Sequence, residues 1–345
     1  MARLSRLLVK LFTISCMCLL ASIAAGEDEY GVFSLLHESS GSFDETLAAV
    51  ASALGESGLS VHARHDVRVP EGQQRAHVFV LTSPGYRELA KNESPRTISA
   101  QVLRVAVYTW GENQTTLVNM ANPVPHAMLY YANSANYDAL VAGAGRAADD
   151  IRAALASIPG TPLNSQQSPE RTEKHYNKFK GDGPARMMAK FRTFRKSQLL
   201  IDESEETRFA ETIASLTRAL SHSKPVELDE PDGWQEIAQI PFGENSVYFG
   251  LSNPYLEDKM IRINSRFRSD GKSENAAYPG VDHVAALPTE VLIIKEAGKT
   301  RVLHYGQMWR MQLYFWDSGY RAFTANVGVP GAISNSIEDF VAASL

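Results

Sequence analysis

The alternation of apolar and polar positions predicts a run of strands and helices that begins near residue 32. Residues 32–37 form a short apolar run typical of a strand, and residues 42–54 place their apolar side chains on one face of a helix. Ser42 followed by Glu45 is typical of a capping box at the start of that helix. Further strands are expected over residues 61–67, 76–82, 102–110 and 116–121, and mainly helix over 126–158.

A second stretch of the chain repeats this succession. Phe209-Ala210-Glu211-Thr212 stands at the start of a predicted helix, as Phe43-Asp44-Glu45-Thr46 does in the first stretch. Two later pairs of segments match in the same order: residues 247–254 with 77–84, and residues 287–303 with 102–121. This shared spacing predicts an internal duplication, which sets the number of domains and creates an interface between halves where a ligand can bind.

The predicted fold is α+β, with two related units that each contain a small antiparallel-rich sheet and helices packed on one face. We expect the first unit over residues 28–158 and the second over residues 197–345, with an insertion near residues 266–283 relative to the first. Residues 159–196 are predicted to be a linker and a basic segment, because residues 159–170 are rich in Pro, Ser, Gln and Thr.

The order of motifs in each half resembles the bacterial family called Domain of Unknown Function 302, present here as tandem copies. The motifs that carry the resemblance are Phe-x-Glu-Thr at 43–46 and 209–212, the turns Ser83-Pro84 and Asn253-Pro254, and the strands 102–108 and 287–291. Together they cover most of residues 30–125 and 195–310. The resemblance implies a small α+β domain with helices packed on an antiparallel-rich sheet. It implies no reaction, because the family is defined without one.

The chain departs from that family at positions where many members carry cysteine. Ser252 and Thr82 stand before the helix turns, and Thr289 stands after the Leu-Pro pair. A thiol-dependent role in relatives therefore does not extend to this chain.

The first residues have the features of a targeting segment. Residues 1–25 combine a basic start, an apolar core over Leu11–Ile23 and small residues around Ala24, which predicts a signal peptide and export to the periplasm or the extracellular space. An uncleaved anchor helix is the alternative. Cys16 and Cys18 both lie in this segment, so the mature chain is expected to use no disulfide, thiolate or cysteine-bound metal.

The net charge and its distribution along the chain limit the kinds of molecule that the protein is expected to bind. The net charge of −5 and the mixed composition argue against a nucleic-acid binder. Residues 171–196 are different, because basic residues outnumber acidic ones there and aromatic residues lie between them. This segment predicts either a peripheral contact with anionic membrane or an acidic partner, or a basic helix that covers the other domain with its aromatic side chains.

No catalytic or metal-binding motif of the sequence assigns an active site or a metal site. The chain has no nucleophile elbow, phosphate loop, dinucleotide fingerprint or zinc-protease helix motif, so catalytic residues and cofactors stay unassigned. His62 and His65 would point to opposite faces of a strand, and although His62, Asp66 and His77 could converge from neighbouring strands, we predict no metal site. Asp282-His283 could act as an acid–base pair, but we expect it to face solvent in the inserted loop.

Aromatic residues give the best binding signal. Residues 308–325 are interpreted as aromatic-rich strands, whose alternation places Arg310, Tyr314 and Trp316 on the face away from the core. This face either binds a ligand or partner or contacts the first domain or the basic segment. Ser83 and Asn253 precede Pro at predicted helix starts, where they either cap the helix or help its amide groups contact a ligand. The candidate ligand-binding residues are therefore Ser83, Asn253, Arg310, Tyr314 and Trp316.

These observations favour an exported, non-catalytic binding protein that recognises a small molecule or an envelope protein. The alternative is an exported enzyme of unassigned reaction, with Asp, Glu or His acid–base groups in a cleft between the two units.

Overall fold

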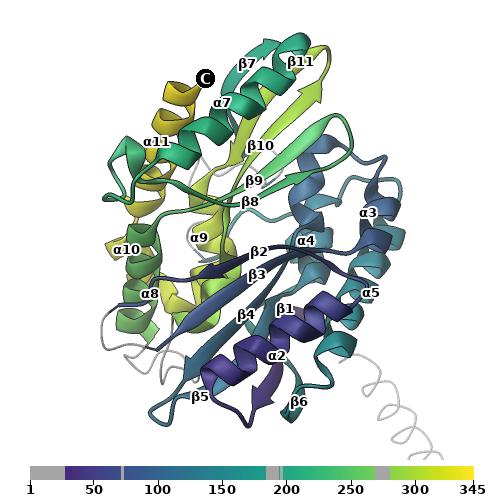
Figure 1. The fold of residues 1–345 in the computed structure, drawn as a ribbon, viewed down its shortest axis with the longest axis vertical. Helices are drawn as coiled ribbons and strands as arrows, with labels where there is room; N and C mark the ends of the chain where they lie inside the picture. The colour runs from purple at the N-terminus through teal and green to yellow at the C-terminus, as the bar shows by residue number, and fades with distance from the viewer. Residues whose placement is uncertain (1–27, 71–73, 184–193, 195–196, 269–279) are drawn as a thin grey trace, which may run out of the picture.

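The computed structural model describes residues 28–345 except 71–73, 184–193, 195–196 and 269–279. The expected signal peptide over residues 1–25 lies outside the described residues. Two antiparallel sheets dominate the structure, one in each half of Figure 1. This arrangement confirms the predicted α+β class with two units. Over the described residues, no helix has both the length and the apolar character needed to cross a membrane.

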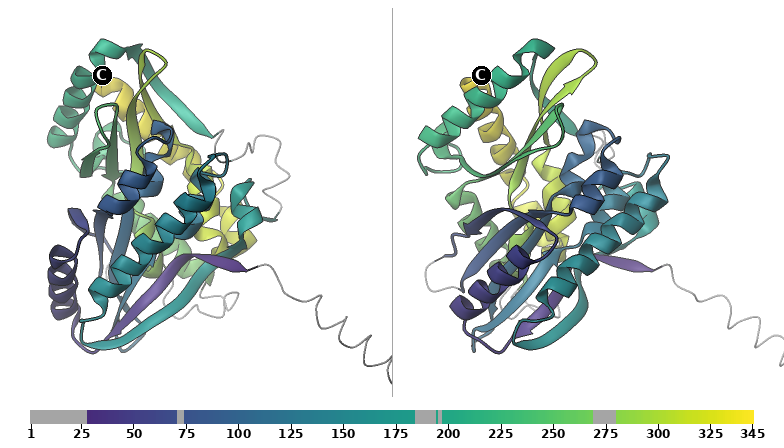
Figure 2. Two further views of the ribbon diagram at one scale, coloured as in Figure 1. Left: turned by 90° about the vertical axis from the view of Figure 1, so that its right-hand side faces the viewer. Right: turned by 45° about the vertical axis from the view of Figure 1, so that its right-hand side comes forward.

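The first unit contains a six-stranded sheet in the order β2-β3-β4-β5-β1-β6. Its elements are β1 (Glu29–Ser39), α2 (Phe43–Glu56), β2 (Ser60–Asp66), β3 (Ala76–Thr82), α3 (Pro84–Ala90), the 3-10 helix η1 (Pro95–Gln101), β4 (Leu103–Trp110), β5 (Thr115–Ala121), α4 (Pro123–Tyr130), α5 (Tyr137–Leu155), β6 (Gly160–Thr172) and α6 (Glu173–Asn177). In Figure 2, α2 and α5 lie together against this sheet.

The second unit contains a five-stranded sheet in the order β7-β11-β10-β9-β8. Its elements are β7 (Gln198–Glu205), η4 (Glu206–Arg208), α7 (Phe209–His222), η5 (Pro231–Gly233), β8 (Gln235–Pro241), β9 (Ser246–Ser252), α8 (Pro254–Arg268), η6 (Val281–Ala286), β10 (Thr289–Glu296), β11 (Lys299–Tyr305), α9 (Gln307–Phe315), η7 (Trp316–Ser318), α10 (Gly319–Ala325) and α11 (Val329–Ser344).

The two sheets share their connectivity and their irregularities. Strands β2-β3-β4-β5-β1 follow the same order as β8-β9-β10-β11-β7, with a helix at each corresponding connection. The β2–β3 pairing shifts register between Val61 and Ala63, and the β8–β9 pairing shifts between Glu236 and Ala238. A second shift occurs in β1 and at the matching place where β11 pairs with β7. A bulge changes the face of the sheet to which the following side chains point. Because the bulges match, equivalent residues of the two sheets point to equivalent faces.

A short helix of each unit packs on the sheet of the other unit. The helix η6 contacts β3, β4 and β5, and η1 contacts β9 and β10 in return, while β2 lies beside β8. Side chains on alternate positions of β10 belong to different cores: Val291 packs under α7 and α11, whereas Leu292 belongs to a core shared with the first unit. The two units are therefore joined by a continuous apolar core.

The segment expected to be a linker is a strand. Residues 160–172 form β6, which pairs with the outer side of β1 along most of its length. Its side chains are mainly exposed, and Pro162 and Pro169 are tolerated because the strand lies at the edge of the sheet. The polar composition that indicated a linker is that of an edge strand with little contact to the core.

The segment expected to be aromatic-rich strands is helical. Residues 307–325 form α9, η7 and α10. The run Gln-Met-Trp-Arg-Met-Gln-Leu contains strong helix formers and no β-branched residue. The prediction was wrong because it applied the two-residue period of a strand to residues that follow the period of a helix. The strand alternation inferred for these residues therefore does not hold.

The described part of the basic segment packs against the fold. Tyr176, Phe179 and Phe194 are buried, and the buried Arg171 pairs with Asp182. Contact of this segment with anionic membrane stays a prediction, since residues 184–193 and 195–196 lie outside the described residues.

Candidate functional site

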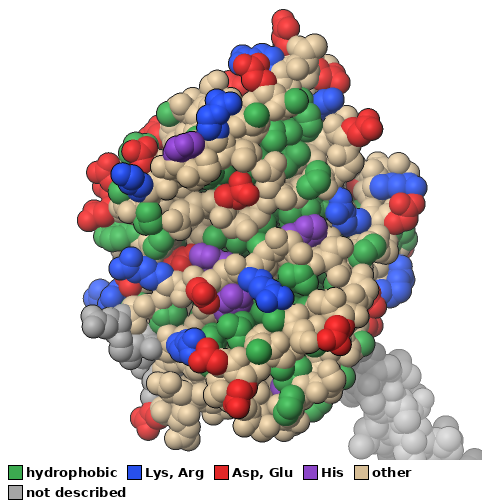
Figure 3. All heavy atoms as spheres, viewed as in Figure 1, with side chains coloured by type: hydrophobic (Ala, Val, Ile, Leu, Met, Phe, Trp, Pro, Cys, Tyr) green, Lys and Arg blue, Asp and Glu red, His purple; other side chains and the backbone are tan. Residues whose placement is uncertain are grey.

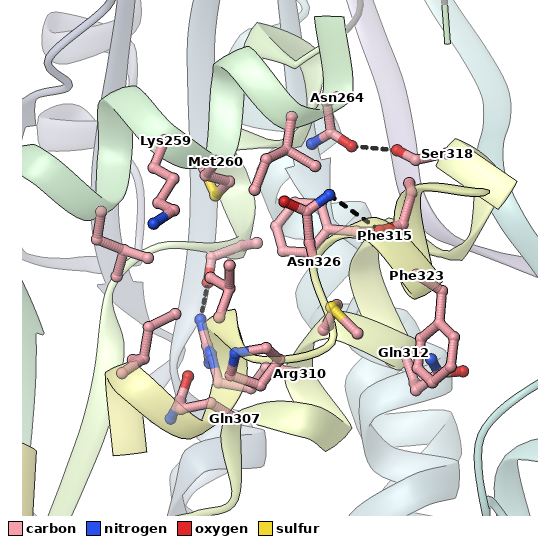
Figure 4. Close-up of a pocket in the computed structure, with 18 of the residues that line it drawn as sticks. Lys259, Met260, Asn264, Gln307, Arg310, Gln312, Phe315, Ser318, Phe323 and Asn326 are labelled. Atoms are coloured by element: carbon pink, nitrogen blue, oxygen red, sulfur yellow. Dashed lines mark hydrogen bonds between the residues drawn. The ribbon is translucent and has the colours of Figure 1, made fainter. Parts of the chain in front are cut away.

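A cavity of about 90 Å³ lies in the second unit between α8 and α9, closed by η7, α10 and α11 (Figure 4). This volume is enough for several water molecules or a small organic group. Its wall is mainly apolar, with side chains that include Leu256, Met260, Leu287, Phe315, Phe323 and Ile333. A concave, largely apolar space with a few polar groups is the usual form of a small-molecule site.

The cavity arises where the two units differ. In the first unit the single long helix α5 packs on α2, α3 and α4, and Gly143 lets it approach closely, because a Cβ there would lie 2.5 Å from Cδ2 of Leu89. In the second unit two shorter helices replace it: α10 contacts α8, and α11 contacts α7 and α9. Residues 326–328 separate the two helices, and residues on both sides of this interruption line the cavity.

Most polar side chains of the wall are bonded to protein groups. Ser318 donates to Asn264, and the Asn326 amide donates to the Ala322 carbonyl at 2.9 Å. The Oε1 atom of Gln312 accepts from the backbone N–H of Asp182 at 3.1 Å.

Two hydrogen-bond donors of the wall, on Gln312 and Lys259, differ from the others in their contacts. The Nε2 atom of Gln312 is buried and has no hydrogen-bond partner among the described residues. The half-buried Lys259 places its ammonium 5.9 Å from the ring centre of Tyr255. In Figure 4 these two side chains lie on opposite sides of the cavity.

A buried ion pair forms part of the cavity floor. Arg310 on α9 lines the cavity and binds the carboxylate of Glu290 on β10. The same guanidinium donates to the backbone carbonyls of Ala286 and Pro288. The hydroxyl of Tyr130, from the first unit, donates to the second oxygen of Glu290 at 3.3 Å. Because its charge is compensated, Arg310 is held rigidly rather than offered to solvent.

A second polar group meets the first across the boundary between the units. Arg104 on β4 donates to His126 Nε2 at 3.0 Å and to the Tyr314 hydroxyl at 2.9 Å, and it also reaches the Ala286 carbonyl. Burial, together with the charge of Arg104, lowers the pKa of His126 to about 3. The ring is therefore neutral, its Nδ1–H donates to the Asn122 carbonyl, and its Nε2 accepts.

These two groups occupy equivalent positions in the two units. Arg104 and Glu290 stand opposite matching residues of β3 and β9. His126 and Arg310 are each the fourth residue after the N-cap of α4 or α9, and Tyr130 and Tyr314 are each the eighth. We call the six residues the junction cluster: Arg104, His126, Tyr130, Glu290, Arg310 and Tyr314. Arg104 of the first unit donates to Tyr314 of the second, and Tyr130 of the first unit donates to Glu290 of the second.

A separate buried cluster surrounds His283. Its Nδ1 lies 2.9 Å from Asp282, and its Nε2 lies 3.1 Å from Asp317. Burial alone would lower the pKa of His283, but the two carboxylates outweigh burial and raise it to about 9. Arg268 binds Asp282 in a bidentate pair and neutralises the remaining charge. The expectation that Asp282-His283 faces solvent was wrong, because η6 presses both side chains against the first sheet.

The candidate residues from the sequence are distributed over three places. Arg310 and Trp316 line the cavity, and Tyr314 lies behind it in the junction cluster. Ser83 and Asn253 accept hydrogen bonds from the first amides of α3 and α8, so each caps a helix outside the cavity wall.

Histidines gather on the face of Figure 3 near the boundary between the units. On β2 and β3, His77 bonds Asp66 at 2.8 Å and His62 bonds Thr82 at 2.9 Å, while His65 pairs with Glu257 of the second unit. Over the described residues, no three His, Cys, Asp or Glu side chains come close enough together to hold a metal ion.

Sequence reasoning missed Lys259, Gln312, Arg104 and Glu290. For the last two a signal exists, because each is the charged residue inside an apolar strand run, Val-Leu-Arg-Val-Ala-Val and Thr-Glu-Val-Leu-Ile-Ile. The predicted cleft between the units also has a counterpart, a groove of about 620 Å³. Its wall carries charges of both signs from α3 and residues 242–246, so it is less suited than the cavity to an apolar ligand.

No protein-family model and no curated protein matches the chain. Among solved structures, a crystal structure of the uncharacterized conserved protein DUF302 from Bacillus stearothermophilus is similar to part of it. The similarity has 20% sequence identity and a TM-score of 0.30, and it covers 36% of this chain and 96% of that one. A likeness at this level supports no conclusion about function.

Proposed function

We propose that this chain is an exported, non-catalytic binding protein, built from two duplicated units that resemble Domain of Unknown Function 302, and that it holds a small, largely apolar molecule in the cavity of the second unit. The observation that carries the proposal is the cavity itself. Its wall is preformed by α8, α9, α10 and α11, and most of its polar groups are fixed by protein contacts.

The duplication is supported by the common strand order and the two matching bulges. The second copy then differs from the first at one point of functional interest. Where the first copy has the single helix α5, the second has α10 and α11, and residues of both helices line the cavity. Binding is therefore assigned to the second copy.

The positions of the titratable groups favour binding over catalysis. A general acid or base must reach the substrate, and its pKa must suit proton transfer. His126 and His283 have strongly shifted pKa values, but both are buried, bonded to protein groups and outside the cavity wall. Among the described wall residues there is no Asp, Glu or His.

Native mass spectrometry of the protein purified from its own compartment tests the proposal. We expect a reproducible extra mass that is lost on denaturation. The variant Ala322→Phe, which adds a ring inside the cavity, should lack this mass, whereas Ala325→Phe on the exposed face of the same helix should retain it. An apo mass for the unaltered protein, or a ligand retained by a folded Ala322→Phe variant, would contradict the proposal.

Export is supported by the basic, apolar and small-residue pattern of the first 25 residues. Amino-terminal sequencing of the protein recovered outside the cytoplasm should start near Ala25. A cytoplasmic protein with an intact first segment would contradict this part of the proposal.

A further inference from the structure

The charges around the cavity are unbalanced. The described wall contains two cations, Lys259 and Arg310, and no carboxylate. Arg310 is neutralised by Glu290 directly behind the wall. The charge of Lys259 is not compensated in this way, because no carboxylate of the described residues lies within ion-pair distance of its ammonium, and its recorded contact is with the ring of Tyr255.

A buried hydrogen-bond donor lies on the other side of the cavity. The backbone N–H of Asp182 fixes the orientation of the Gln312 amide, because it requires the oxygen of that amide as its acceptor. The Nε2 atom of Gln312 is then left buried without an acceptor, an arrangement that native proteins rarely leave uncorrected. A ligand atom that accepts a hydrogen bond would satisfy it.

We infer that the ligand is a small organic monoanion whose carboxylate pairs with Lys259, whose apolar body fills the cavity, and whose far end carries a hydrogen-bond acceptor for Gln312. This inference rests on the proposed function. Figure 4 shows the two donors on opposite sides of the space, so one carboxylate does not serve both. A single ammonium balances one negative charge, which favours a carboxylate over a doubly charged phosphate.

The apolar wall between the two donors selects the body of the ligand. Met260, Phe315 and Phe323 lie in this part of the wall, and they can pack against an aromatic or branched aliphatic group. A strongly hydrated ligand such as a sugar would leave its hydroxyl groups unpaired against these side chains.

Titration calorimetry with the mature protein and matched probes tests the inference. The panel consists of small aromatic and branched aliphatic carboxylates, each paired with its primary amide, which has a similar shape and no charge. It includes 4-acetylbenzoate, 4-acetylbenzamide and 4-isopropylbenzoate, the last of which lacks the acceptor. We expect the acids to bind roughly tenfold more tightly than their amides, and 4-acetylbenzoate to bind more tightly than 4-isopropylbenzoate.

The variant Lys259→Met should remove the preference for acids, because it weakens binding of the acids much more than binding of the amides. Lys299→Met, at the exposed first residue of β11 and outside the cavity wall, is the control and should behave as the unaltered protein. Amides that bind as well as acids, or a preference that survives Lys259→Met, would overturn the inference while the proposed function stands. If no member binds and the purified protein also carries no ligand, both fail.

Discussion

Arg104 and Glu290 occupy equivalent strand positions in the two halves of the molecule, yet one is a cation and the other an anion. Burial alone would lower the pKa of Arg104, but nearby groups that include Tyr314 and Glu290 outweigh burial and raise it, so the guanidinium stays charged. A charged residue in an apolar strand could be recognised in the sequence, but its partners could not, because they come from distant helices.

Two buried histidines contribute to the pH dependence of stability in opposite directions. His126 has a pKa of about 3 in the folded chain and about 6.5 when unfolded, so only the unfolded chain takes up a proton as the pH falls below 6.5. His283 has a folded pKa of about 9, so its stabilising charge is fully present below pH 6.5 and is lost as the pH rises through 9. Stability should therefore be greatest near pH 6.5.

We expect the urea midpoint to fall on both sides of that pH, by an amount that corresponds to a few kcal/mol over the full range. Measurement between pH 5 and 9 keeps most carboxylates ionised. His126→Asn should make the acidic limb shallower and leave the alkaline limb unchanged, because His62, His77 and His304, whose pKa values burial also lowers, still contribute on the acidic side. His283→Asn should make only the alkaline limb shallower. A slope that does not change in the corresponding variant would contradict the assignment.

At the scale of elements, the sequence predicted the helices and strands whose apolar residues recur with a clear period. It missed those whose apolar residues do not. The predicted strand 76–82 coincides with β3, and the predicted helix 42–54 lies within a residue or two of α2. The edge strand β6 was missed because its side chains are mainly exposed and polar. The helix α9 was missed because a short aromatic run fits both periods. The cavity could not be predicted, since four helices and the break between α10 and α11 create it.

The equivalent helices α2 and α7 begin differently, and this difference can be measured. Ser42 and Glu45 form a complete capping box at the start of α2, whereas Arg208 makes no side-chain capping bond at the start of α7. We expect Ser42→Ala to lower the free energy of unfolding by about 1 kcal/mol. Arg208→Ala, which removes only a solvent-screened ion pair with Glu211, should change it much less. Equal losses in chemical denaturation would contradict this comparison.

At the scale of the whole molecule, the two units share one apolar core. The helices η1 and η6 are exchanged between the sheets, and the larger core includes side chains from both. The sequence predicted a repeat, but it did not predict the reciprocal contacts, because they join residues far apart along the chain.

We therefore expect both units to unfold in one transition. Hydrogen exchange with mass spectrometry should show β4 and β10 losing protection together as urea is increased. If β10 stayed protected after β4 had exchanged, the second unit would be stable by itself, and its own core under α7 and α11 would be the reason.

The opposite charges of Arg104 and Glu290 have a consequence for how such a molecule could have arisen. In a dimer of identical chains, both positions would carry the same residue, and like charges would approach each other at the axis. Joining the two copies in one polypeptide removes that restriction, so each copy can evolve its own half of a complementary pair. It also makes the pairing independent of protein concentration, because a tethered partner does not leave on dilution.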